Sequence, residues 1–177
     1  NLRIQGRMRI GEDDLRAAYK RNATEERRKL EFRAAWIRFQ IQPGAGSAGA
    51  ATQRDLAARV AARAQAGADF GQLARTYSTD VATRELGGLL APMRPGELPA
   101  EVDSVLLGME PGEVSAPVRL GDAWLVLQLV ERAPSQLPEY ERAKPQLQTR
   151  VYAEKMDVAR RQWLDSLRKR THVDIRL

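Results

Sequence analysis

Alternation of apolar and polar side chains marks the clearest strand of this chain. Ile37, Phe39 and Ile41 are separated by polar residues, and Pro43-Gly44 ends the run. This period of two predicts a strand over 35–42 with one apolar face.

Further strands are predicted in the second half of the chain. The segments 113–119 and 123–130 are joined by Gly121-Asp122, a pair typical of a two-residue hairpin, so they are expected to be antiparallel neighbours. A fourth, short strand is expected over 89–91, directly after the Gly87-Gly88 break.

Helical patterns occupy the segments between these strands. Residues 12–21 begin with acids and end with bases, which complements a helix dipole. Apolar residues at helical spacing predict a helix over 51–66, and Asp69 is a typical N-cap for a short helix over 70–77. Another short helix is predicted over 99–107. This order of elements predicts an α+β fold.

A long helix is predicted after Pro134. Its apolar residues recur every three to five positions, and Pro145 is expected to interrupt its first turns or to set its start. The stripe is expected to pack on the N-terminal segment, with a missing upstream domain as the alternative partner. Residues 173–177 alternate again and predict a short strand. The stripe consists of Leu147, Val151, Met156, Ala159, Trp163 and Leu167.

Composition excludes several classes of protein. A chain of 177 residues with 43% apolar content can bury one core with helical arms. The absence of Cys excludes thiol chemistry, disulfides and Cys-ligated zinc, and it suits an oxidising compartment. No apolar run approaches the ~20 residues of a membrane span, so membrane insertion is not expected. The net charge is +6, but Arg residues alternate with acids along the chain, so nucleic-acid binding is not expected either.

Five short motifs occur in a fixed order along the chain and carry a family resemblance. They are FGQLA at 70–74, YSTD at 77–80, Gly87-Gly88, PGEVS at 111–115 and Pro117-Val118. Over about 35–132 this ordered set resembles the parvulin family of peptidyl-prolyl isomerases. The flanking phrases RMRIGEDDLRAAY and LRKRTHVDIRL are similar to the arms of SurA- and PpiC-type periplasmic chaperones.

The resemblance implies a parvulin-like four-stranded antiparallel sheet flanked by helices, with helical N- and C-terminal arms. Its implied boundaries are an N-terminal arm and helix over 1–34, left from a chaperone region, a parvulin-like domain over 35–133, and a long helix with a short strand over 134–177. A signal peptide is expected to have been removed or to lie outside this fragment, because Asn1 follows no basic and apolar leader.

The resemblance also implies which residues form the site. Asp80 matches the family's aspartate-or-cysteine position and is the candidate catalytic residue. The first family histidine falls at Phe39, or at Trp36 in a different strand register, and the second falls at Leu125. The candidate peptide-binding residues are Phe39, Leu89, Met93, Leu98, Val102, Leu107, Leu120, Trp124 and Leu125.

The residues themselves also admit ordinary structural roles. For Asp80, a role as a turn or helix-cap aspartate is as well supported as a role in the pocket. The apolar candidates also fit ordinary core or strand positions. His172 is the one histidine of the chain and lies in the terminal arm. Glu12 and Asp13 complement a helix dipole, and no metal or cofactor is expected.

Three functions follow from these readings. The first is a weakly catalytic prolyl isomerase and chaperone domain that acts on unfolded, outer-membrane or secreted clients. The alternative is an inactive parvulin fold that binds unfolded or proline-containing polypeptides. A third makes the domain a spacer or dimerisation element, while the arms carry the function. Separately, a homodimer through the terminal arms is expected. The resemblance implies a periplasmic or otherwise exported protein.

Overall fold

The computed structural model of this protein describes residues 9–170, with side chains through Arg168. The described residues divide into two compact units. One unit is Thr24–Ser135, and the other combines the residues up to Ala23 with those from Gln136 onward. The expected strand over 173–177, the lone His172 and the first eight residues of the N-terminal arm lie outside the described residues.

The larger unit contains a three-stranded antiparallel sheet. Strand β1 (Phe32–Gln40) pairs with β3 (Ala123–Arg132), which also pairs with the short β2 (Val118–Leu120), so the order is β1-β3-β2. Strands β2 and β3 meet at the Gly121-Asp122 turn, where Gly121 has a φ of 55°. The predicted α+β class and the antiparallel hairpin are therefore confirmed.

The expectation of a fourth strand was wrong. Residues 88–93 run beside the free edge of β1 but form only two isolated bridges with it, Ala35↔Leu89 and Phe32↔Met93. In a regular antiparallel ladder the two residue numbers of each pair have a constant sum, yet these sums are 124 and 125. One extra residue thus lies between the bridges and breaks the ladder. Pro92, which has no backbone N–H, occupies this interval.

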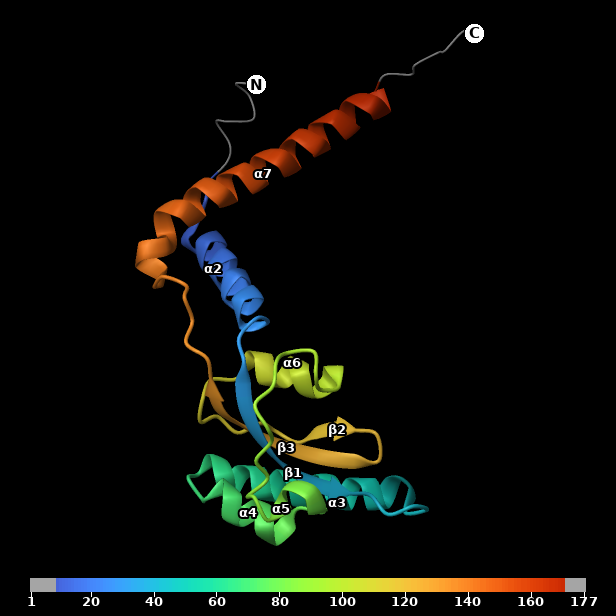
Figure 1. The fold of residues 1–177 in the computed structure, drawn as a ribbon. Coiled ribbons are helices and arrows are strands. Elements are labelled where there is room, and N and C mark those ends of the chain that lie inside the picture. The colour runs from blue at the N-terminus through green and yellow to red at the C-terminus, as the bar shows by residue number, and fades with distance from the viewer. Residues whose placement is uncertain (1–8, 171–177) are drawn as a thin grey trace. The chain divides into compact units, whose positions relative to one another are not determined.

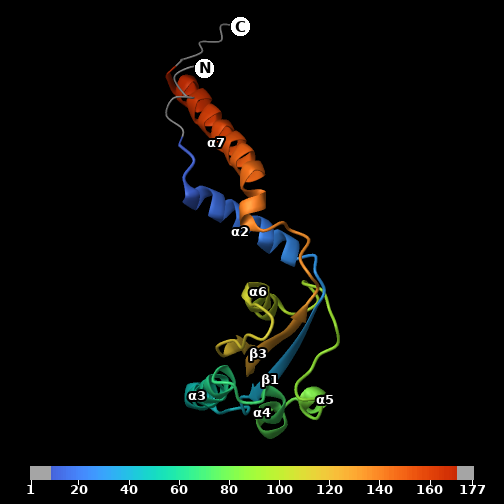
Figure 2. The same ribbon diagram turned by 90° about the vertical axis from the view of Figure 1, so that its left-hand side faces the viewer.

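Helices cover both faces of the sheet and create two apolar cores (Figures 1 and 2). Helices α3 (Gly46–Gln65) and α4 (Phe70–Tyr77) lie on one face, and α6 (Ala100–Gly108) lies on the other. The short α5 (Val81–Arg84) follows α4. On the α3/α4 side the buried core includes Ile37, Phe39, Ala57, Val60, Phe70, Leu73 and Val126. On the α6 side it includes Phe32, Ala34, Val102, Leu106, Leu125, Leu127 and Leu129.

The smaller unit contains α2 (Glu12–Arg27) as far as Ala23, together with α7 (Tyr140–Arg170). Leu15 and Ala18 of α2 pack against buried Ala143, Leu147 and Val151 of α7, and the helix continues through Pro145. The expected stripe is therefore engaged at Leu147 and Val151.

The second half of that stripe is exposed. Trp163 is 51% exposed and Leu167 is 38% exposed. The expected packing of these two side chains on the residues of the N-terminal arm is thus not seen among the described residues.

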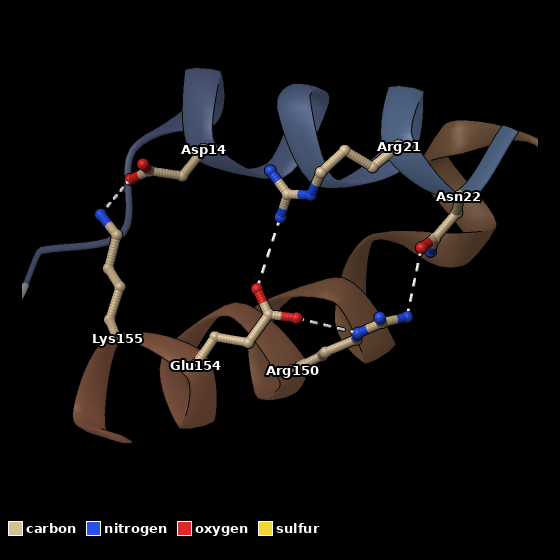
Figure 3. Close-up of polar contacts among 6 residues, drawn as sticks. All are labelled: Asp14, Arg21, Asn22, Arg150, Glu154 and Lys155. Carbon is tan, nitrogen blue, oxygen red and sulfur yellow. Dashed lines mark hydrogen bonds and ion pairs between the residues drawn. The ribbon is translucent and has the colours of Figure 1, made fainter. Parts of the chain in front are cut away.

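Polar pairs flank the apolar contact between α2 and α7 (Figure 3). Lys155 Nζ lies 2.6 Å from Asp14 Oδ2, and Arg21 Nη2 lies 3.4 Å from Glu154 Oε2. Arg150 donates to Glu154 and to the Asn22 side chain. Because solvent screens such exposed pairs and they add little stability, the apolar contact supplies most of the stability of this unit.

Gly88 provides a test of the way residues 88–93 dock on β1. Its φ is 80°, and a Cβ atom there would lie 2.2 Å from the Trp36 carbonyl oxygen. Gly44 also has a φ of 80°, but a Cβ atom there would have no neighbour within 4 Å. Each Ala substitution should lose about 1–2 kcal/mol because of the positive φ. Gly88→Ala should lose roughly 1–3 kcal/mol more, since the backbone must move. Urea unfolding of both variants measures the difference, and equal losses would show that the docking is loose.

Candidate functional site

The face of β1 toward α6 presents both aromatic and charged side chains. Side chains along a strand point alternately to the two faces of its sheet. Ile37 and Phe39 point into the α3/α4 core, so Trp36 and Arg38 lie on the α6 side. Trp36 is half-buried against the α6 core.

The segment after α4 brings a carboxylate to this face. The backbone N–H of Thr79 donates to the Arg38 carbonyl at 2.8 Å, and the Arg38 N–H donates to Ser78 Oγ at 3.1 Å. Ser78 is buried, and Thr79 Oγ1 also accepts from the Gln40 N–H at 3.2 Å. These bonds fix residues 78–80 beside β1 and so place Asp80 next to Trp36.

The Asp80 carboxylate is satisfied by its neighbours. Oδ2 accepts from Trp36 Nε1 at 2.6 Å and from Thr83 Oγ1 at 2.6 Å. Oδ1 accepts from the Ala82 N–H at 3.2 Å, which makes Asp80 the N-cap of α5. Asp80 therefore caps the N-terminus of α5 and holds the indole ring of Trp36 at the same time.

The pKa of Asp80 is lowered from its ordinary value of 3.8. Burial raises this pKa, but the hydrogen bonds from Thr83, Trp36 and Ala82 and the nearby positive charge of Arg38 together outweigh the burial. The residue is thus a carboxylate at neutral pH. It accepts hydrogen bonds here and has no proton to give.

Five of the predicted binding residues gather on the α6 side. Val102 and Leu125 are fully buried and form its floor, whereas the other three are half-buried against the same core. Those three are Met93, Leu98 and Leu120. Together with Trp36 they give an apolar surface beside Asp80.

The remaining four lie elsewhere. Phe39 and Trp124 belong to the α3/α4 side of the sheet, because the alternation of side chains along β1 and β3 points them there, and Leu89 packs against the same core. Leu107 lines a separate depression on the outer side of α6 with Asp103 and Ser104. These four residues therefore lie apart from the surface beside Asp80, whereas Trp36, one of the two candidate positions for the first histidine, lies on it.

Sequence reasoning missed two polar residues of this face. Thr83 follows Asp80 by three positions, the spacing at which a helix-cap side chain meets the first turn. The period of two places Arg38 on the same strand face as Trp36. Arg38 was missed because all of the predicted peptide-binding residues are apolar. Among the described residues, no three His, Cys, Asp or Glu side chains are grouped as a metal site requires.

The sheet covered by α3 and α4 on one face and α6 on the other defines a parvulin-type isomerase fold. Residues 36–131, more than half of the chain, match the family model "Rotamase: PPIC-type PPIASE domain". This chain belongs to that family.

Relatives and solved structures agree with this membership. The chain is 32% identical over 115 residues to the chaperone SurA of Alkalilimnicola ehrlichii, covering 65% of this chain and 26% of that protein. It is 33% identical over 111 residues to SurA of Methylobacillus flagellatus, covering 63% and 25%. The chain therefore spans about a quarter of the length of these relatives.

Two solved structures share the fold. A crystal structure of a PpiC-type peptidyl-prolyl cis-trans isomerase domain matches with a TM-score of 0.54 and 22% identity, covering 63% of this chain and 99% of that domain. The peptidylprolyl isomerase PrsA from Bacillus cereus matches with a TM-score of 0.52 and 20% identity, covering 93% and 58%. Within residues 9–170 no helix has the length and apolar character needed to cross a membrane.

The lowered pKa of Asp80 makes its contribution to stability depend on pH. A carboxylate whose folded-state pKa is lowered stabilises the fold above its unfolded pKa, and this stabilisation is lost as the pH falls through the folded-state pKa. Asp80→Asn keeps the shape and the cap but removes the charge. We expect the gap in unfolding free energy between the parent chain and Asp80→Asn to be widest near neutral pH and to narrow as the pH falls below 3.8, the ordinary pKa of Asp.

Urea unfolding at several pH values measures that gap. Asp55→Asn makes the same chemical change at an exposed position of α3 and serves as the control. A gap for Asp80→Asn that stays constant between neutral and acidic pH would contradict the assigned cause.

Proposed function

We propose that this domain binds extended, proline-containing segments of unfolded polypeptides on the α6 side of its sheet and isomerises their prolyl bonds slowly. Unfolded outer-membrane or secreted proteins are the proposed clients, because the related SurA proteins are named chaperones. The observation that carries the proposal is the pair of half-buried side chains Leu98 and Leu120, which pack over the buried Leu125 beside Trp36 and Asp80.

The chemistry of prolyl isomerisation explains why apolar contact can suffice for some activity. The barrier of ~18–20 kcal/mol comes from amide resonance, and neither proton transfer nor a covalent intermediate is needed to cross it. A surface that buries the proline ring and removes water favours the less conjugated, twisted amide. The half-buried Leu98 and Leu120 are suited to that contact.

Few hydrogen-bond donors remain on this face to stabilise the twisted amide. Where the resemblance puts the family's histidines, the chain has Phe39 or Trp36 at the first position and the buried Leu125 at the second. The single indole N–H of Trp36 already donates to Asp80, and so does the Thr83 hydroxyl. Each missing transition-state hydrogen bond lowers the rate by about one to two decades, at ~1–3 kcal/mol per bond.

A second candidate is peptide binding without isomerisation. The satisfied carboxylate of Asp80 favours it, since three donors already occupy that group. The two candidates differ in turnover alone, so one preparation assayed for both isomerisation and suppression of client aggregation separates them.

Export and self-association complete the proposal. We place the protein in the periplasm or another exported compartment on the strength of its family and its lack of Cys. A homodimer through the terminal arms is supported by the exposed Trp163 and Leu164 of α7.

Isomerase activity on a chromogenic prolyl tetrapeptide, followed in a protease-coupled assay, should be well below that of a parvulin with both histidines. Asp80→Ala should remove most of the remaining activity, because Trp36 and α5 lose their anchor, while aggregation suppression is retained. Activity equal to that of an intact parvulin would contradict the proposed weak catalysis. Unchanged activity in Asp80→Ala would show that Asp80 serves as a helix cap and has no role in catalysis.

The binding surface is tested by a pair of matched Leu variants. Leu98→Asp places a charge on the α6 side and should abolish binding of an apolar prolyl peptide. Leu56→Asp makes the same change at a half-buried position on the α3/α4 side and should leave peptide binding intact. Peptide titration monitored by tryptophan fluorescence provides the measurement, and equal effects of the two variants would refute the assigned surface.

A further inference from the structure

A permanent cation lies directly opposite the position where the family's second histidine is lost. Arg38 of β1 is the cross-strand partner of Leu125 in β3. Side chains of directly opposed residues lie on the same face, with Cβ atoms about 4.5–5.5 Å apart. The guanidinium of Arg38 therefore belongs to the same face as Trp36, Leu120 and Leu125.

The contacts of Arg38 hold it on this face without using all of its donors. Its Nη2 lies 3.3 Å from Asp122 Oδ1, on the turn between β2 and β3. Its Nε is buried and has no hydrogen-bond partner among the described residues. A guanidinium carries five N–H donors, and a buried donor without an acceptor costs about 1–3 kcal/mol. The side chain as a whole is 40% exposed, so a ligand can reach it.

The other donors of the site are already engaged. Trp36 Nε1 and Thr83 Oγ1 both donate to Asp80. The Gln40 amide donates to the carbonyl groups of Ile41 and Asp122. Arg38 thus stands out on this face as a charged, partly exposed donor with capacity for a ligand.

We propose that Arg38 is the hydrogen-bond donor that this site offers to a bound prolyl peptide, and that it acts on the twisting amide. The inference rests on the proposed binding of proline-containing segments to the α6 side. In the planar amide the nitrogen lone pair is conjugated with the carbonyl and accepts hydrogen bonds poorly. As the bond twists, the lone pair returns to the nitrogen, which becomes an acceptor for the guanidinium.

This interaction is stronger in the transition state than in the ground state. Arg38 therefore raises kcat, with little effect on KM. The neighbouring Leu120 and Leu125 exclude water and strengthen the bond. No proton is transferred and no bond is broken, so the peptide is released unchanged except for the isomer of its prolyl bond.

The role can be tested by substitutions in the full 177-residue chain. Arg38→Met should lower kcat on a chromogenic prolyl tetrapeptide about tenfold or more and change KM less than about threefold. Arg38→Lys keeps the charge but not the fork and should retain part of the activity. Arg119→Met is the control, because it removes a charge near the same turn but on the opposite face, where Arg119 lies over the Trp124 ring.

A pH profile separates donation from a merely structural role. Arg stays protonated throughout the accessible range, so Arg38 remains a donor with the same charge at pH 5.5 and pH 8. In Arg38→His the imidazole is charged at pH 5.5 and neutral at pH 8, so its kcat should be higher at the acidic end, relative to the parent chain at the same pH. Circular dichroism at both pH values checks that the variant is folded, and if Arg38→Met fails to fold, Arg38→Lys and Arg38→His carry the test.

The outcomes distinguish this inference from the proposed function. Peptide binding with unchanged kcat in Arg38→Met, or an equal loss in Arg119→Met, overturns the role of Arg38 and leaves the proposed function standing. Peptide binding with no isomerisation by the parent chain overturns the role of Arg38 and leaves the binding module. Failure of the parent chain to bind prolyl peptides overturns both.

Discussion

The hydrogen bonding of both edges of β1 is the constraint on which the domain depends. One edge pairs with β3 along its length. Residues 78–93 occupy the other edge. The Thr79 N–H donates to the Arg38 carbonyl, and the Leu90 N–H donates to the Ala34 carbonyl. The Trp36 N–H donates to the Gly88 carbonyl. Because a buried backbone group without a partner is costly, this second edge fixes where the segment after α4 must lie. The carboxylate of Asp80 reaches the site as a consequence of that backbone docking.

With β1 fixed, the period of its side chains decides the chemistry of the site. The sequence predicted this strand, the helices other than α5, and the hairpin, because each has a local pattern of period or turn residues. Trp36 and Phe39 could not be separated by motif spacing, since either fits the family pattern in one register. In the structure the two side chains lie on opposite faces: Phe39 shares a face with Ile37 and lies in the α3/α4 core, whereas Trp36 lies on the α6 side, the face proposed to bind peptides. The fourth strand failed as a prediction because the extra residue between Leu89 and Met93 breaks a ladder without changing any local pattern.

Asp80 combines a helix cap with a tertiary contact in one carboxylate. Its Oδ1 caps α5, as expected for a turn aspartate, while its Oδ2 receives the indole and hydroxyl donors of the site. Helix α5 and the indole ring of Trp36 are thereby linked through one carboxylate. The sequence indicated the cap through its position before VATR, but the partners on Oδ2 lie up to 44 residues away and depend on tertiary packing.

The loss of histidines does not by itself decide whether such a site can isomerise proline. A reaction without proton transfer needs no group that titrates near neutral pH; it needs a donor or a surface that favours the twisted amide over the planar one. On this face Trp36 and Thr83 donate inward to Asp80, so they stabilise the protein equally whether the bound amide is planar or twisted. Interactions that are equal in both states cannot change the barrier. On the proposed binding surface, a hydrogen-bonding contribution to catalysis would therefore require a donor that meets the peptide. Arg38 lies opposite Leu125 on β1, a strand that is hydrogen-bonded along both edges and so holds its side chains in position.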